Sequence, residues 1–271
     1  MRAESVLAAG LFFLAACSRD AAAPAANDLT SGADQPVANA NPPALAAVAP
    51  RVVAEPPSAC PKGMALVDGM YCPDVRQTCL KYMDPPGRYE YFRCAEYQKP
   101  AACASKQKKH LRFCIDKNEF VKEGESLPAN RQSYNDAERI CTGLGKRVCL
   151  ESEYNFACEG EEMRPYPYGF KRDPTACNAD HFDVVSPAGT LRDLRAPPGA
   201  YPRCESPFGV RDLSGNLEEF VSIDGSKPVR PAMKGAYWQP SRNFCRAAQT
   251  AHDRFYHGTE TGFRCCSDPP K

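Results

Sequence analysis

Fifteen cysteines among 271 residues constrain the fold of this chain more than any other feature. Apart from Cys17, all of them lie between Cys60 and Cys266, and their even number suits complete pairing in an oxidising compartment. No two cysteines are separated by only two residues, and exported thiols tend to oxidise, so zinc binding explains the pattern poorly. Together with 26 prolines, the cysteines predict a loop-rich domain in which disulfides, worth about 2–4 kcal/mol each, supplement a modest core.

Cys17 ends an N-terminal apolar run and has a different role from the other cysteines. Arg2, the apolar residues 6–16 and the small residues before Cys17 are typical of a secretory signal. The run is too short to span roughly 30 Å of hydrocarbon. Its end, Leu-Ala-Ala-Cys, resembles the lipobox of bacterial lipoproteins. This resemblance implies a signal peptide over residues 1–16, acylation of Cys17, as with palmitate, and anchoring in the cell envelope. Ser18 implies the outer membrane.

Composition separates a tether from a folded part. Residues 17–59 are rich in Ala, Pro and Asn and cannot bury enough apolar surface to offset the entropy lost on ordering. We therefore expect a lipid-anchored tether here and a folded domain over residues 60–268. The formal net charge of +1 gives no electrostatic reason to expect nucleic acid as a partner. Attachment to the membrane is expected through the N-terminal lipid.

A basic, aromatic and cysteine-rich insertion occupies residues 73–112 of this domain. Just before it, Asp68-Gly69 predicts the turn of a short hairpin. The insertion's aromatic side chains would suit a surface for sugars or nucleic acid, but the cysteines between them favour the core of a small disulfide-bonded subdomain. These side chains are Tyr89, Tyr91, Phe92 and Tyr97.

Two helices are predicted within a chain that otherwise reads as short strands and loops. Ser133 with Asp136 resembles a capping box, and Gly145 supplies the stop of the first helix. A second helix fits residues 151–158, with Gly160 ending it. The mixture indicates the α+β class with little regular secondary structure.

Seven local patterns, in one order, resemble the formylglycine-generating enzyme or sulfatase-modifying factor family, whose fold is related to C-type lectins. They span nearly all of the folded part, so the resemblance implies that fold for residues 60–266. The patterns are Phe113–Phe120, Ser133–Ala137, Gly145–Arg147 with Glu151–Ala157, Tyr166–Gly169, Pro207–Phe220, Lys234–Trp238 and Gly262–Arg264.

The resemblance does not extend to the residues of the family's oxidation chemistry. Active members oxidise a substrate cysteine with Cu(I), which two cysteines four residues apart hold shortly after a Gly-Gly-Ser-Trp-like turn. Soft thiolates are needed because they bind Cu(I) in a linear arrangement. Here the turn is Gly235–Trp238, and Cys245 is the only cysteine between it and Gly262. Cys245 falls nearer to the family's structural disulfide cysteine than to either copper ligand, so no copper is expected.

The resemblance also implies two disulfides and a calcium ion as structural cofactor. The implied disulfides are Cys158–Cys265 and Cys177–Cys245. The neighbours Cys265 and Cys266 should reach different partners, because a bond between adjacent residues is strained. Calcium prefers hard oxygen donors, and the implied ligands are Asn216 with Glu219, and Asn178 with Asp193. The alternative is that Asn216 caps a turn and Glu219 is solvated; the family's Trp-Glu-Trp is here Glu218-Glu219-Phe220.

A histidine pattern raises iron as an alternative metal. His181 and Asp183 form an H-x-D triplet, to which His252 or His257 would add the third ligand of a 2-His-1-carboxylate site. Such triplets are common by chance, and a surface loop is the favoured interpretation.

Two functions follow from these patterns. The first is a noncatalytic cell-surface module that presents the fold's pocket to a protein or glycan ligand, or that serves a structural role in the envelope. The second is an oxidoreductase of the same family with a divergent active site that uses iron or copper. For the first, the candidate pocket surrounds Tyr237, Trp238, Arg242 and Arg246. Trp238 would be its aromatic anchor or else a buried residue of the turn.

Overall fold

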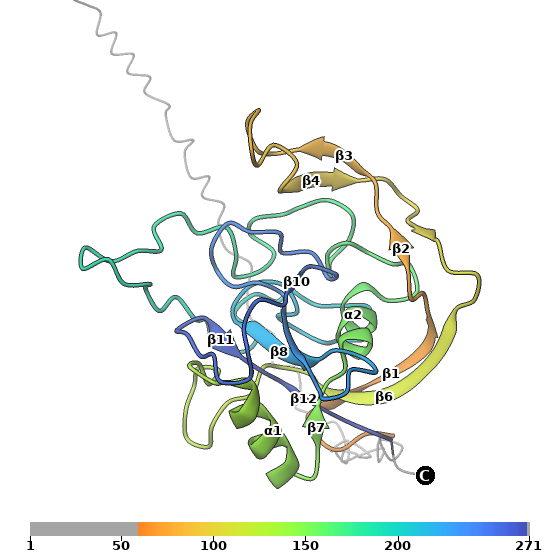
Figure 1. Ribbon diagram of the computed structural model, residues 1–271, viewed down its shortest axis with the longest axis vertical. Coiled ribbons are helices and arrows are strands. Elements are labelled where there is room, and N and C mark those ends of the chain that lie inside the picture. Colours follow the sequence, from red (N-terminus) through yellow and green to blue (C-terminus); the bar gives the residue numbers. More distant parts are fainter. Residues whose placement is uncertain (1–58, 270–271) are drawn as a thin grey trace, which may run out of the picture. The chain divides into compact units, whose positions relative to one another are not determined.

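Two long strands organise the first sheet of the computed structural model, which describes residues 59–269. β1 (Met64–Tyr71) and β6 (Lys109–Asp116) pair antiparallel over all eight residues of each. The C-terminal strand β12 (Cys265–Ser267) adds to the other edge of β6, and β7 (Arg147–Val148) adds to β12, so the order is β1-β6-β12-β7. Segments far apart in the sequence therefore meet in one sheet (Figure 1).

A second sheet completes the core. Its order is β10 (Ala248–Gln249), β9 (Pro231–Lys234), β8 (Glu218–Ser222) and β11 (Thr261–Gly262), with β11 parallel to β8 and the other pairs antiparallel. Helix α2 (Glu151–Glu159) lies between β8 and the β1–β6 pair (Figure 1). Its Tyr154, Phe156 and Ala157 pack in one cluster with side chains of both sheets. No helix within residues 59–269 is long and apolar enough to cross a bilayer.

Both predicted helices are confirmed. Helix α1 (Tyr134–Gly143) starts at the capping box, where Asp136 N–H donates to Ser133 Oγ at 3.2 Å and Ser133 N–H donates to Asp136 Oδ2 at 3.1 Å. Helix α2 ends at Gly160, whose φ of 63° suits a residue without a Cβ atom. Two helices among short strands and long loops give the predicted α+β fold.

The predicted hairpin turn at Asp68-Gly69 is wrong, because β1 continues straight through it. Gly69 lies opposite Leu111 in the strand pair, and the next residue, Met70, donates its N–H to Glu161 Oε1 at 2.7 Å. A Cβ atom on Gly69 would come within 2.7 Å of the same oxygen. The glycine therefore permits a close approach to the chain beyond α2 rather than a turn.

The insertion forms two further strand pairs, β2 (Val75–Arg76) with β5 (Ala102–Cys103) and β3 (Cys79–Tyr82) with β4 (Cys94–Tyr97). Most of its aromatic side chains do not form the expected small core. Tyr89 is 58% exposed and Tyr91 is 71% exposed. They belong to the loop that joins β3 to β4, whose two ends the Cys79–Cys94 disulfide links. In this loop Tyr91 contacts the ring of Tyr82, and Tyr89 contacts the ring of Phe92.

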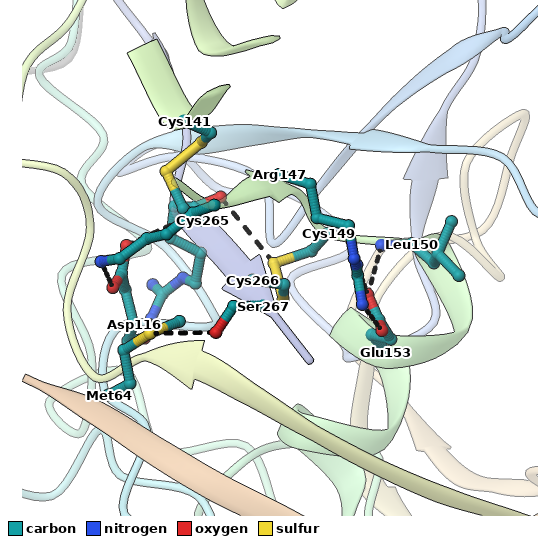
Figure 2. Close-up of a disulfide and its surroundings, with 12 residues drawn as sticks. Met64, Asp116, Cys141, Arg147, Cys149, Leu150, Glu153, Cys265, Cys266 and Ser267 are labelled. Carbon is teal, nitrogen blue, oxygen red and sulfur yellow. Dashed lines mark hydrogen bonds and ion pairs between the residues drawn. A yellow bond between two sulfur atoms is a disulfide. The ribbon is translucent and has the colours of Figure 1, made fainter. Parts of the chain in front are cut away.

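Seven disulfides pair every cysteine of the described part. Two of them join the C-terminal strand β12 to the rest of the fold, because Cys265 bonds to Cys141 of α1 and Cys266 bonds to Cys149 (Figure 2). Successive residues of a strand point to opposite faces, so the two neighbours reach different partners, as predicted. The other five are Cys60–Cys114, Cys72–Cys103, Cys79–Cys94, Cys158–Cys245 and Cys177–Cys204.

The two disulfides implied by the resemblance, Cys158–Cys265 and Cys177–Cys245, are wrong. The end of α2 lies beside the segment after the Gly235–Trp238 turn, where the Cα atoms of Cys158 and Cys245 are 5.5 Å apart. Cys265 is in β12, which packs against α1, and it bonds to Cys141 there. Cys177 bonds to Cys204 within the long loop region before β8. The expected acylation of Cys17 and the tether over residues 17–59 fall outside the described residues, except for Ala59.

Candidate functional site

The turn that resembles the family's active-site turn follows strand β9. Gly235 has a φ of 82°, and a Cβ atom there would lie 2.6 Å from the hydroxyl of Tyr154 on α2, so only glycine lets the turn close onto the helix. Trp238 follows and is 0% exposed. Of the two interpretations of Trp238, the structure agrees with the buried residue of the turn and not with the surface anchor, because the indole is part of the core.

The cysteine of the segment after the turn is in a disulfide and is not a free thiol. Cys245 bonds to Cys158, and its N–H donates to the carbonyl of Pro165 at 2.7 Å. This confirms the interpretation of Cys245 as a structural cysteine, although its partner differs from the expected one. With all cysteines of residues 59–269 in disulfides, this part of the chain offers no thiolate to Cu(I). The donor set does not fit copper.

A small cavity of about 190 Å³ lies beside this turn. Arg242 lines it, and its guanidinium carbon is 5.4 Å from the ring centroid of Phe92, which comes from the insertion. The exposed loop of the insertion thus reaches the segment that follows the Gly235–Trp238 turn. The full lining is Phe92, Glu218, Ala236, Ser241, Arg242, Ala247, Ala248 and Gln249.

The carboxyl group of Glu218, which lines this cavity, has a raised pKa. Burial, and secondarily the nearby Glu260 carboxylate, raise its pKa to about 7. Within residues 59–269 no cation forms an ion pair with it, although Arg242 lines the same cavity. Burial and the same two carboxylates also raise the pKa of Tyr237 to about 12. The cavity wall can therefore change its charge near neutral pH.

Arg246 does not share this cavity with Arg242. Its guanidinium donates to both carboxylate oxygens of the buried Glu159, at 2.7 and 2.6 Å, and to the carbonyls of Cys72 and Pro73. The two arginines do line another cavity together, of about 330 Å³, against the aromatic side chains of the insertion. Trp238 is in the core and Tyr237 packs edge-on against it. The four residues predicted to form one pocket therefore share it only in part.

A buried ionic network lies behind the site. Arg264, 1% exposed, donates from Nε and Nη2 to both oxygens of Glu219 at 2.7 and 2.6 Å. Glu119 accepts from the amide of Asn216 and from Leu217 N–H, and Asp212 is also buried. One guanidinium cannot neutralise three carboxyl groups, and burial raises the pKa of each of them, that of Asp212 from 3.8 to about 6.

The acidic side chains among the predicted calcium ligands are bonded to arginines. Glu219 is fully buried against Arg264, so the expectation of a solvated Glu219 is wrong. Asp193 accepts from Nε and Nη2 of Arg195. Asn178 and Asn216 do meet, through a 2.8 Å amide–amide hydrogen bond. No three His, Cys, Asp or Glu side chains of residues 59–269 are grouped for a metal ion, and in this arrangement calcium would have to displace a guanidinium to gain either acidic ligand.

The H-x-D triplet is divided between two separate contacts. The His181 ring bonds Asn178 Oδ1 at 2.8 Å, whereas Asp183 pairs with Arg192 at 2.6 Å and is 78% exposed. His252 stacks on Tyr256, 3.6 Å between ring centroids. His257 contacts the carbonyl of Phe255. The histidines thus make separate local contacts in these loops.

The buried carboxyl groups predict a pH dependence. A raised pKa in the folded state means that the contribution of Asp212 to stability is present below pH 3.8 and is lost as the pH rises through about 6. Asp212→Asn keeps a residue that tolerates the observed φ of 57°. We expect the stability of the wild type relative to this variant to fall between about pH 4 and pH 7. Urea unfolding at several pH values measures this difference, and a constant difference would contradict it.

Sequence reasoning missed two features of the site. One is Glu218, although its replacement of the family's first tryptophan after Asn216 was a visible signal. The other is the approach of Phe92 to Arg242, which no local pattern could predict because it joins an insertion to a turn almost 150 residues later.

Comparisons with known proteins agree with this architecture. A family model described as the sulfatase-modifying factor enzyme 1-like domain matches residues 83–269. The inactive C-alpha-formylglycine-generating enzyme 2 of Bos taurus is 28% identical over 133 residues, which cover 44% of this chain and 40% of that protein. The formylglycine-generating enzyme of Bos taurus is 25% identical over 166 residues, 52% of this chain and 44% of that protein. The chain thus spans less than half the length of these relatives.

Among solved structures, that of CarF superposes with a TM-score of 0.54 and 13% sequence identity, covering 78% of this chain and 99% of that chain. At this identity the likeness concerns the fold.

Proposed function

Because the chain belongs to the family of sulfatase-modifying factor enzyme 1-like domains, we propose that it is a noncatalytic member that uses the fold as a binding module. The observation that carries this proposal is the state of its sulfur atoms. Copper-dependent oxidation needs two thiolates after the active-site turn, and here the only cysteine of that segment is bonded to Cys158. One matched relative is itself named as an inactive formylglycine-generating enzyme, so loss of activity has a precedent in the family.

The proposed binding surface is the edge formed by the small cavity and the exposed loop of the insertion. Phe92 and Arg242 join the two, and Tyr89 and Tyr91 continue an exposed aromatic surface beside them. Aromatic rings with arginine are suited to protein or glycan ligands, since they bury large areas and keep a polar edge.

We further propose that the module is exported and anchored through acylated Cys17, in the cell envelope and at the outer membrane. The support is the N-terminal sequence pattern together with seven disulfides, which are typical of oxidising compartments. Calcium as a structural ligand near Asn178 and Asn216 remains a proposal that rests on the resemblance.

Thiol counting and metal analysis of the purified mature protein test the proposal. We expect no reactive thiol after denaturation without reductant, and no stoichiometric copper or iron after incubation with either metal. A free thiol at Cys245, or copper bound one to one, would favour the divergent oxidoreductase instead.

A further inference from the structure

The cavity that Arg242 and Arg246 share, here called the aromatic cavity, lies between the insertion and the segment after the Gly235–Trp238 turn. Its volume of about 330 Å³ is within the range of small-molecule sites. Every residue in its wall is at least partly exposed, so a ligand that enters from solvent can reach the wall. The lining residues are Val75, Gln77, Cys79, Tyr82, Tyr91, Phe92, Tyr97, Arg242, Phe244 and Arg246.

Aromatic rings form half of this wall, and three of the five belong to tyrosines. The rings of Tyr82 and Tyr91 meet edge-on, 4.9 Å between centroids, and both side chains are exposed. The negative face of such a ring attracts the C–H bonds on the flat face of a sugar, and its hydroxyl group bonds to sugar hydroxyls. Gln77 donates from Nε2 to the carbonyl of Met163 at 3.2 Å, so its oxygen faces the ligand as an acceptor. The wall therefore matches a ligand with flat apolar faces and many hydroxyl groups.

One charge of the wall is unmatched, and it is positive. No carboxylate lines the aromatic cavity, and Arg246 is paired with Glu159 at 2.6 Å. Arg242 forms no ion pair with any residue of 59–269, and Glu218 lines the small cavity but not this one. The ring of Phe92 orients the Arg242 guanidinium from 5.4 Å. A guanidinium in this state favours an anion, and its planar fork matches a carboxylate through two parallel hydrogen bonds.

We propose that the aromatic cavity binds an acidic oligosaccharide, with a uronic-acid carboxylate on Arg242 and sugar rings packed against Tyr82 and Tyr91. This inference rests on the proposed function, because it names the class of ligand for that binding surface. An acidic peptide would match the charge of Arg242, but its carboxylate side chains carry no ring for the tyrosines. A neutral glycan would match the rings and leave the guanidinium without an acceptor.

The experiment compares matched probes on the mature full-length protein by calorimetry. Trigalacturonate and a hexasaccharide of alternating glucuronate and N-acetylglucosamine are the acidic sugars. The methyl ester of trigalacturonate keeps the rings without the charge, and triglutamate keeps the charge without the rings. We expect saturable binding of an acidic sugar, with affinity at least about tenfold weaker for the ester and for the peptide, because hydrogen bonds between charged groups are the stronger ones.

Two results would overturn the proposal. One is that neither acidic sugar binds saturably, and the other is that the ester or the peptide binds as tightly as the acidic sugar. Tight binding of triglutamate would refute the sugar ligand and still leave a noncatalytic binding module. Thiol counting and metal analysis test the noncatalytic role without any ligand, so the two proposals can fail separately.

Variants locate the site. Arg242→Gln should weaken binding of the acidic sugar about tenfold or more, and Tyr91→Ala should weaken binding of both the acid and its ester, since it removes a ring. Arg88→Gln is the matched control. Arg88 is also exposed and lies over an aromatic ring of the insertion, 5.3 Å from the centroid of Tyr89, but it does not line the aromatic cavity. Unchanged affinity in Arg242→Gln, or an equal loss in Arg88→Gln, would refute the assignment.

Discussion

Replacing Arg264 with alanine should destabilise the folded domain by about 3–5 kcal/mol, since it leaves a buried carboxylate without its partner. The guanidinium donates hydrogen bonds to both carboxylate oxygens of Glu219 and to the backbone carbonyl of Asp116, the last at 3.3 Å. Its loss would therefore remove the only cation bonded to Glu219 among the described residues. Chemical denaturation with disulfides intact measures the change.

Arg211 provides the matched control for this substitution. It pairs with Glu205 at 2.9 Å, but both side chains are 42% exposed, so Arg211→Ala should cost less than about 1 kcal/mol. If the two variants lost stability equally, the buried network could not be what holds the site's supporting strands together.

The second large effect is expected at Trp238. Because the side chain is 0% exposed, Trp238→Ala should cost about 3–5 kcal/mol through lost packing and an unfilled cavity. Trp238→Phe should cost clearly less, since it keeps an aromatic ring in the same space. Thermal or urea unfolding of both variants measures this. A stable Trp238→Ala protein that had lost only ligand binding would restore Trp238 as a surface anchor.

The elements that were predictable from the sequence are those fixed by neighbouring residues. The first helix starts at Ser133 because its hydroxyl and Asp136 satisfy backbone groups within one turn. Gly69 shows the limit of such reasoning: a glycine after an aspartate predicts a turn, but here it accommodates Glu161, which is remote in sequence. Local chemistry alone does not distinguish a turn from a close approach.

Disulfide connectivity depends on tertiary placement and was not predictable from the family pattern. Cys158 bonds to Cys245 because α2 is packed against the segment after the turn, and Cys265 bonds to Cys141 because β12 enters the sheet beside β7. Cys245 bonds to Cys158 and not to the expected Cys177. The inference that this segment lacks copper ligands does not depend on which partner it has, because it requires only that Cys245 is in a disulfide.

The most direct test of a noncatalytic role is oxygen consumption with a thiol-bearing peptide. Mature protein with its disulfides intact is incubated with Cu(I), a reductant too weak to open the buried disulfides, and a cysteine-containing peptide, alongside an active formylglycine-generating enzyme. We predict no oxygen uptake and no aldehyde in the peptide, because the sulfur atoms of Cys158 and Cys245 are bonded to each other and cannot bind the metal as thiolates. Multiple turnovers, with aldehyde formed in step with oxygen consumed, would contradict the account.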